Sequence, residues 1–131
     1  DEDNIYLAKA LIIGPSDTPY HNGFYLFNIV FPENYPFSPP KVTLHTLDPY
    51  NHIRLNPNLY TCGKVCLSIL GTWSGPGWTS IMNIFSVFTS IVFFKFTLAT
   101  TPPPNRRSMK VPINSAIYGS IFIRCSFQLF Y

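Results

Sequence analysis

Two residues near the middle of the chain, Cys66 and Asn58, have side chains suited to acyl-transfer chemistry. A thiol is the strongest side-chain nucleophile near neutral pH, but a carbonyl that it attacks develops an oxyanion, which needs a hydrogen-bond donor. The Asn58 amide carries two N–H groups without a charge, and Pro57 restrains its loop. The segment therefore predicts a nucleophile with an oxyanion donor, although a lone cysteine beside a strand is more often a buried core residue.

Extended segments are predicted on both sides of this loop. Aromatic and β-branched residues typical of strands, separated by connections rich in Gly, Pro and Asn, occupy residues 6–13, 24–31 and 41–45. A turn at Asn22-Gly23 favours antiparallel pairing of the first two strands, and residues 65–67 are expected to form a short fourth strand or an extended stretch. The predicted fold class is therefore α+β, an antiparallel four-stranded meander followed by a helix.

Apolar side chains recur at helical spacing between Ile81 and Val92, with polar residues opposite them. Thr79 or Ser80 is expected to cap the start of this helix. Polar residues interrupt the segment, and its purest apolar stretch, residues 84–94, is too short to span a bilayer. We therefore expect an amphipathic core helix and no membrane insertion.

Charge is distributed unevenly along the chain. Residues 1–94 hold all six carboxylates and four basic residues, whereas residues 95–131 hold five basic residues and no carboxylate. Because no acid follows Asp48, a pair of catalytic carboxylates as in glycosidases is not expected. The five cations are dispersed and form no long basic run, so nucleic-acid binding is not expected either.

The three cysteines, Cys62, Cys66 and Cys125, are an odd number without the spacing of a disulfide framework. Together with an N-terminus that lacks a signal peptide, they predict a reducing compartment, cytoplasmic and/or nuclear. The three histidines are scattered, and none is placed by the sequence beside Cys66 as a hydrolase base or completes a set of zinc ligands. No metal and no cofactor are therefore expected.

Several motifs follow one another in an order that is more specific than any of them alone. Residues 14–25 contain a Gly-Pro turn followed by Gly-Phe-Tyr, residues 31–42 contain Tyr-Pro-Phe-Ser-Pro-Pro, and Asn58 precedes Cys66 by eight positions. In this order the motifs resemble the catalytic core of the ubiquitin-conjugating enzymes. Residues 71–78 resemble the atypical subgroup that has an insertion between the active cysteine and the next helix.

The resemblance implies that residues 1–91 form a partial ubiquitin-conjugating catalytic core. Cys66 would accept ubiquitin or a ubiquitin-like modifier as a thioester from an activating enzyme and pass it to a substrate lysine, without metal or cofactor. Asn58 would support the second step, either by stabilising the oxyanion or by shaping its loop as an Asx-turn residue. The implied partners are the modifier, a ubiquitin-activating enzyme, a ubiquitin ligase and a protein substrate.

Phe37 and Ser80 match positions at which the family contacts its ligases. A buried aromatic residue is the alternative interpretation of Phe37, and both Trp73 and Trp78 are interpreted as packing residues. Ser80 stands where many family members have proline. Asn56 stands where they usually have histidine, and this change is expected to alter loop hydrogen bonds more than chemistry.

The resemblance covers only part of the fold. The chain opens at the first strand, without the family's amino-terminal helix, and the resemblance stops near Ile91. Residues 92–131, with three consecutive prolines at positions 102–104, are expected to form a divergent tail that does not complete the fold. The predicted function is a ubiquitin-conjugating enzyme, and the alternative is a catalytically impaired, truncated variant that acts as a binding module.

Overall fold

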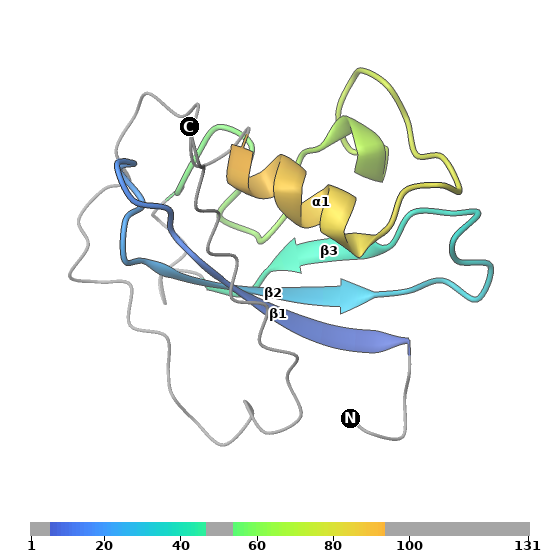
Figure 1. Ribbon diagram of the computed structural model, residues 1–131, viewed down its shortest axis with the longest axis horizontal. Coiled ribbons are helices and arrows are strands. Elements are labelled where there is room, and N and C mark those ends of the chain that lie inside the picture. The colour runs from blue at the N-terminus through green and yellow to red at the C-terminus, as the bar shows by residue number, and fades with distance from the viewer. Residues whose placement is uncertain (1–5, 47–53, 94–131) are drawn as a thin grey trace, which may run out of the picture.

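The computed structural model describes residues 6–46 and 54–93 of the chain (Figure 1). These ranges contain Cys66, Asn58 and both positions expected to contact a ligase. The tail beyond Phe93, including Cys125, lies outside the described residues. Its predicted divergence from the family fold therefore stays a prediction.

Three antiparallel strands form the sheet, in the order β1 (Leu7–Ile13), β2 (Phe24–Val30) and β3 (Lys41–Leu44) (Figure 1). Leu11 lies opposite Leu26 in the first pair, which ends at Ile13 and Phe24, and the ten residues between these two form the connection. Each observed strand lies within a segment that the sequence predicts. The meander and its antiparallel pairing are therefore confirmed.

The fourth strand predicted over Val65 to Leu67 is wrong. Among the described residues, this segment pairs with the sheet through one isolated bridge, between Lys64 and Thr43, and the Leu44 amide donates to the Gly63 carbonyl at 2.8 Å. Residues 65–67 do not extend this pairing, because Val65 instead bridges to Leu59 of the preceding loop. A hairpin therefore replaces the edge strand.

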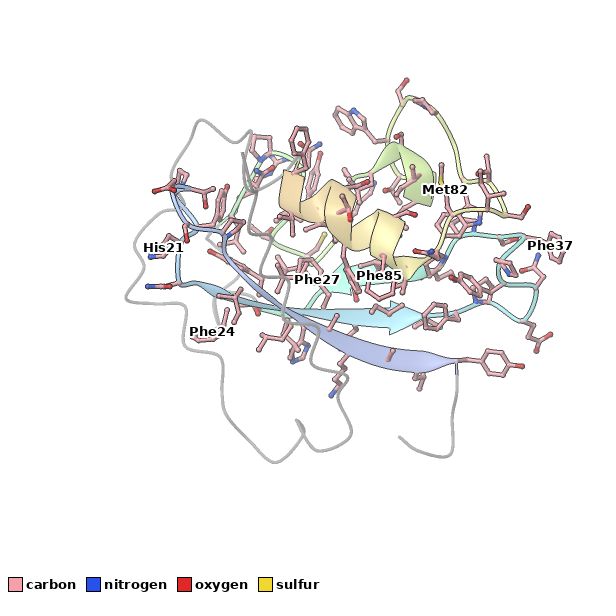
Figure 2. All side chains as sticks on the ribbon, viewed as in Figure 1. His21, Phe24, Phe27, Phe37, Met82 and Phe85 are labelled. Atoms are coloured by element: carbon pink, nitrogen blue, oxygen red, sulfur yellow. The ribbon has the colours of Figure 1, made fainter. Side chains whose placement is uncertain are left out.

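The short α-helix α1 (Ile84–Ser90) packs on one face of the sheet (Figure 1), and a 3-10 turn, η1 (Ser68–Leu70), precedes it in the described part of the chain. Strand side chains alternate between two faces, and those on this face are buried together with the apolar side of the helix. Phe27 lies fully buried between the sheet and α1 (Figure 2). The other residues of these elements in the core cluster are Ala10, Ile12, Tyr25, Ile29, Val42, Leu44, Val87 and Phe88.

The start of α1 differs from the prediction. Asn83 is the cap, and its side chain accepts hydrogen bonds from the amides of Phe85 (2.9 Å) and Ser86 (3.3 Å). Thr79 is occupied in a turn, where its carbonyl accepts from the Met82 amide at 2.9 Å. Ile81 is consequently 90% exposed and does not join the core, so the predicted cap at Thr79 or Ser80 is wrong.

The helix does not continue regularly after Ser90. Residues 91–93 form a π-helical turn, which still buries Ile91 and Val92 against the core. Within the two described ranges, no helix has the length and apolar character needed to cross a membrane.

Candidate active site

A small hairpin holds Cys66 and Asn58 opposite each other. The Cys66 amide donates to the Asn58 carbonyl at 2.9 Å, and two residues along, the Tyr60 amide donates to the Lys64 carbonyl at 3.0 Å. These two hydrogen bonds lie on either side of the bridge between Leu59 and Val65. The structure therefore brings together the two residues that the sequence selects, across seven intervening positions.

Side-chain alternation fixes the direction in which the pair faces. Leu59 and Val65, which lie opposite each other within the hairpin, are 0% and 1% exposed and point into the core. Adjacent positions of an extended chain point to opposite faces, so Asn58 and Cys66 point away from the Leu59 side of the hairpin. Asn58 and Cys66 thus lie on the same face of the hairpin, opposite to that of Leu59 and Val65, although Cys66 is itself covered and only 1% exposed.

Asn56 shapes the loop that presents Asn58. Its side-chain oxygen accepts from the Asn58 backbone amide at 2.8 Å, which is the geometry of an Asx turn. An Asx-turn role is one of the two alternatives expected for Asn58, but its side-chain amide forms no hydrogen bond with the residues that the structure describes. Asn56 therefore performs the loop-shaping role, and the Asn58 amide keeps its donors for another group.

Tyr20 connects this loop to the first part of the chain. Its buried hydroxyl donates to the Leu55 carbonyl at 2.9 Å and accepts from the Asn56 side chain at 3.2 Å. Burial raises the pKa of the Tyr20 hydroxyl, and the hydrogen bond from Asn56 lowers it in part. Sequence reasoning missed this positioning role, although the Asn-Pro-Asn segment does carry a signal for an Asx turn.

The insertion after the cysteine folds back onto both sides of Cys66. The Thr72 hydroxyl donates to the Val65 carbonyl at 2.7 Å and accepts from the Leu67 amide at 2.9 Å. Residues 71–77 are otherwise exposed, and Trp73 among them is 56% exposed. The interpretation of Trp73 as a packing residue is therefore wrong, and Thr72 attaches the loop.

The two cysteines in the described part of the chain differ in accessibility. Cys66 is only 1% exposed, whereas Cys62, in the turn of the same hairpin, is exposed and free. Of the two thiols, that of Cys62 is therefore the accessible one in this structure. Among the described residues, no three His, Cys, Asp or Glu side chains gather into a group that could hold a metal ion.

Phe37 and Ser80 lie on two loops that are joined to each other. The Trp78 indole N–H donates to the Pro36 carbonyl at 2.6 Å, and the Trp78 ring lies 6.1 Å from that of Tyr35. Trp78 is thus a packing residue, as expected. Phe37, in the loop between β2 and β3, is 78% exposed (Figure 2). Its alternative interpretation as a buried aromatic residue is therefore wrong.

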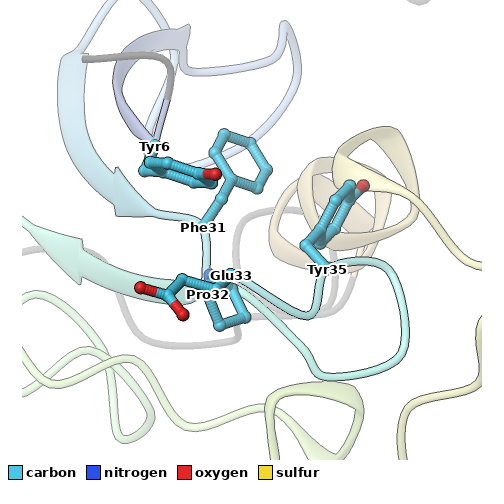
Figure 3. A pocket seen from close by; sticks show the side chains of 5 residues that line it. All are labelled: Tyr6, Phe31, Pro32, Glu33 and Tyr35. Carbon is cyan, nitrogen blue, oxygen red and sulfur yellow. The ribbon is translucent and has the colours of Figure 1, made fainter.

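A shallow cavity of about 280 Å³ lies at the base of the Phe37 loop (Figure 3). Its walls come from the start of β1, the end of β2 and the loop that follows, and the rings of Phe31 and Tyr35 meet edge to face at 4.9 Å. Tyr6, Pro32 and Glu33 complete the lining. Neither Cys66 nor Asn58 lines this cavity, so it is separate from the candidate nucleophile.

The chain as a whole matches a known protein family. The family model described as "Ubiquitin-conjugating enzyme" matches residues 1–115, which is most of the chain. The chain belongs to the ubiquitin-conjugating enzyme family. The resemblance that the motifs suggest is therefore confirmed, and the α+β fold class agrees with the solved structures of this family.

Ubiquitin-conjugating enzyme E2 Z of Danio rerio is 56% identical over 91 residues, which cover 70% of this chain and 27% of the relative. The human E2 Z is likewise 56% identical over 91 residues, covering 68% of this chain and 25% of the relative. The chain thus spans about a quarter of the length of these relatives.

A solved ubiquitin-conjugating enzyme from Plasmodium falciparum superposes with a TM-score of 0.61 at 28% identity, covering 77% of this chain and 79% of that one. Human ubiquitin-conjugating enzyme E2 G1 gives a TM-score of 0.59 at 32% identity, with 71% of each chain covered. The three strands and the helix described above therefore form part of the family's fold.

Proposed function

We propose that the chain accepts ubiquitin, or a ubiquitin-like modifier, as a thioester on Cys66 and transfers it to a lysine of a protein substrate. The opposition of Cys66 and Asn58 across the hairpin, in a chain of this family, carries the proposal. Thioester formation on a cysteine and transfer to lysine are the general mechanism of ubiquitin-conjugating enzymes. The site needs no cofactor, because a thiolate supplies both the nucleophile and the leaving group.

The chemistry proceeds through two acyl transfers. The Cys66 thiolate attacks the carbonyl of the thioester that links the modifier to the activating enzyme, and the enzyme's sulfur leaves as a thiolate. A substrate amine then attacks the new thioester carbonyl, loses a proton and expels the Cys66 thiolate. In the second step Asn58 donates from its side-chain amide to the oxyanion, which is most important where the attacking group is an amine.

Phe37 and Ser80 are proposed to contact a ubiquitin ligase. Both are exposed, and the hydrogen bond between Trp78 and Pro36 holds their two loops together. An exposed aromatic side chain on a supported loop supplies contact area with little loss of conformational freedom. Serine in place of the family's usual proline leaves the Ser80 loop less restrained.

The burial of Cys66 favours a second candidate function. A thiol that is 1% exposed is not ready for attack, and a chain in which it stays covered would act as a non-catalytic module that binds the modifier or another partner. The two candidates differ in a covalent product, because only the enzyme forms an adduct with the modifier.

Incubation with ubiquitin-activating enzyme, ubiquitin and ATP separates these candidates. We expect an adduct of this chain with ubiquitin on non-reducing gels that requires ATP and disappears with reductant. Association with ubiquitin that is independent of ATP, without any adduct, would instead support the binding module. A matched reaction without the activating enzyme tests for spontaneous acylation.

A further inference from the structure

Arg54, Tyr60 and Lys64 form a compact cationic cluster on the hairpin of the candidate nucleophile, which we call the Tyr60 patch. The guanidinium carbon of Arg54 lies 4.0 Å from the centroid of the Tyr60 ring, and the Lys64 ammonium nitrogen lies 6.0 Å from it. Both distances fall in the range of cation–π interactions. Arg54 also donates to the Pro57 carbonyl, so its side chain is held in place before any ligand arrives.

The positive charge of the Tyr60 patch is not balanced within the described part of the chain. Asp17 and Glu33 are the carboxylates of residues 6–46 and 54–93, and neither forms an ion pair with Arg54 or Lys64. Glu33 instead lines the cavity at the end of the sheet (Figure 3). Both cations lie near the same ring, and an acidic ligand at this surface would be attracted to each of them.

The Tyr60 patch faces the same side of the hairpin as the candidate nucleophile. Tyr60 lies opposite Lys64, just as Asn58 lies opposite Cys66, and the one pair between them points into the core. Successive pairs on one face of an extended hairpin lie about 7 Å apart. When a substrate lysine reaches Cys66, the residues next to that lysine therefore pass close to Arg54 and Lys64.

We propose that the Tyr60 patch binds acidic side chains that flank the acceptor lysine of protein substrates. The inference rests on the proposed function of Cys66 and adds the kind of protein substrate that the chain prefers, one with acidic residues beside the acceptor lysine. An Arg guanidinium has five N–H groups in a planar fork, of which Arg54 uses one on the Pro57 carbonyl, so others can donate to a carboxylate. Lys64 adds a second charge beside it, and the patch selects acceptors by their sequence near the lysine.

Single-turnover discharge of the charged chain tests this specificity. The acceptors are a peptide with one lysine flanked by glutamates, a matched peptide with glutamines in their place, and free lysine. At low salt we expect about two- to fivefold faster discharge to the glutamate peptide, the effect of one or two exposed ion pairs, and a smaller difference at high salt. Arg54→Gln and Lys64→Gln should each reduce this preference and leave discharge to free lysine unchanged.

Lys9→Gln is the matched control, because it removes one cation from β1, the strand farthest from the hairpin. Equal discharge to both peptides by the unmodified chain, or an equal loss of preference in Lys9→Gln, would overturn the proposal. If Arg54→Gln slows thioester formation but not transfer to the peptide, the Tyr60 patch binds the activating enzyme or the modifier. That result would also overturn the proposal.

If neither the unmodified chain nor any variant forms a thioester with the modifier, the proposed function is contradicted. Peptide binding then tests the Tyr60 patch independently. In amide spectra we expect the glutamate peptide, but not the glutamine peptide, to shift the signals of Tyr60 and Lys64. The absence of such shifts would overturn the proposal.

Discussion

At the scale of single residues, the loop before Cys66 divides two roles between two asparagines. Asn56 is buried and forms the Asx turn, whereas the Asn58 side chain stays free of hydrogen bonds with the described residues. The Asn58 backbone carbonyl binds the Cys66 amide, and this bond does not depend on the identity of the side chain. Substitutions at the two positions should therefore have different consequences.

Asn58→Ala should slow transfer to an amine by about a hundredfold or more and slow charging much less. The expected loss corresponds to the roughly 3–4 kcal/mol measured for removal of one oxyanion donor. Single-turnover charging and lysine discharge measure the two steps separately. Equal loss in both steps would contradict the donor role and would indicate a collapsed loop, for which Asn56→Ala serves as the reference variant.

Tyr20→Phe should lower the free energy of unfolding by about 1–2 kcal/mol, because it removes the hydroxyl's hydrogen bonds to the Leu55 carbonyl and from the Asn56 side chain. The raised pKa of Tyr20 also predicts a pH dependence. The folded state retains the proton longer, so this contribution is present below pH 10.0 and is lost as pH rises through the higher folded pKa. Urea unfolding across this range should show a shallower alkaline decline in Tyr20→Phe, and identical slopes would contradict the assignment.

At the scale of elements, α1 is short and depends on its first turn. Its seven residues make few internal hydrogen bonds, so the cap that Asn83 provides accounts for a large share of its local stability. Ser86 completes a capping box by accepting from the Asn83 amide at 3.3 Å. The helix carries Val87 and Phe88 into the core, which links its stability to that of the sheet.

Asn83→Ala should therefore destabilise the fold by about 1 kcal/mol, the usual cost of losing a cap side chain. Ser80→Ala is the matched control, since Ser80 is exposed and does not cap the helix. Thermal or urea unfolding compares the two variants. A larger effect at Ser80 than at Asn83 would mean that the helix begins where the sequence alone predicts.

The sequence predicts those elements whose signal is local. Strand-forming residues separated by connections rich in Gly, Pro and Asn predict the meander, whereas the hairpin that joins Asn58 to Cys66 is not predicted. The contact between Asn56 and Tyr20 joins positions 36 apart, so it depends on tertiary packing that no local pattern reveals. The cap was misplaced because Thr79, Ser80 and Asn83 all have capping side chains, and the turn closed by Thr79 decides among them.

At the scale of the whole molecule, the described core leaves large apolar side chains exposed. Ile81, Phe85 and Phe93 are 90%, 59% and 51% exposed, and all three belong to α1 or its flanks. Such exposure is a common feature of surfaces that bind another protein, and in an isolated chain it favours association. The fold therefore predicts that the isolated chain self-associates as its concentration rises.

Phe85→Gln should reduce concentration-dependent association of the chain without lowering its unfolding free energy by more than about 0.5 kcal/mol. Thr89→Gln, at another exposed position of α1, controls for the added side chain. Sedimentation velocity at rising concentration measures the effect. Unchanged association in Phe85→Gln would exclude this surface as its cause.

The most direct test of the central claim, that Cys66 accepts the modifier, is the chemistry of the adduct itself. Cys66→Ser should replace the reductant-sensitive adduct with a reductant-resistant oxyester, because an alkoxide is a poorer leaving group than a thiolate. Cys62→Ser, which alters the exposed cysteine of the same hairpin, should leave the thioester intact. A reductant-sensitive adduct that persists in Cys66→Ser, or disappears in Cys62→Ser, would contradict the assignment.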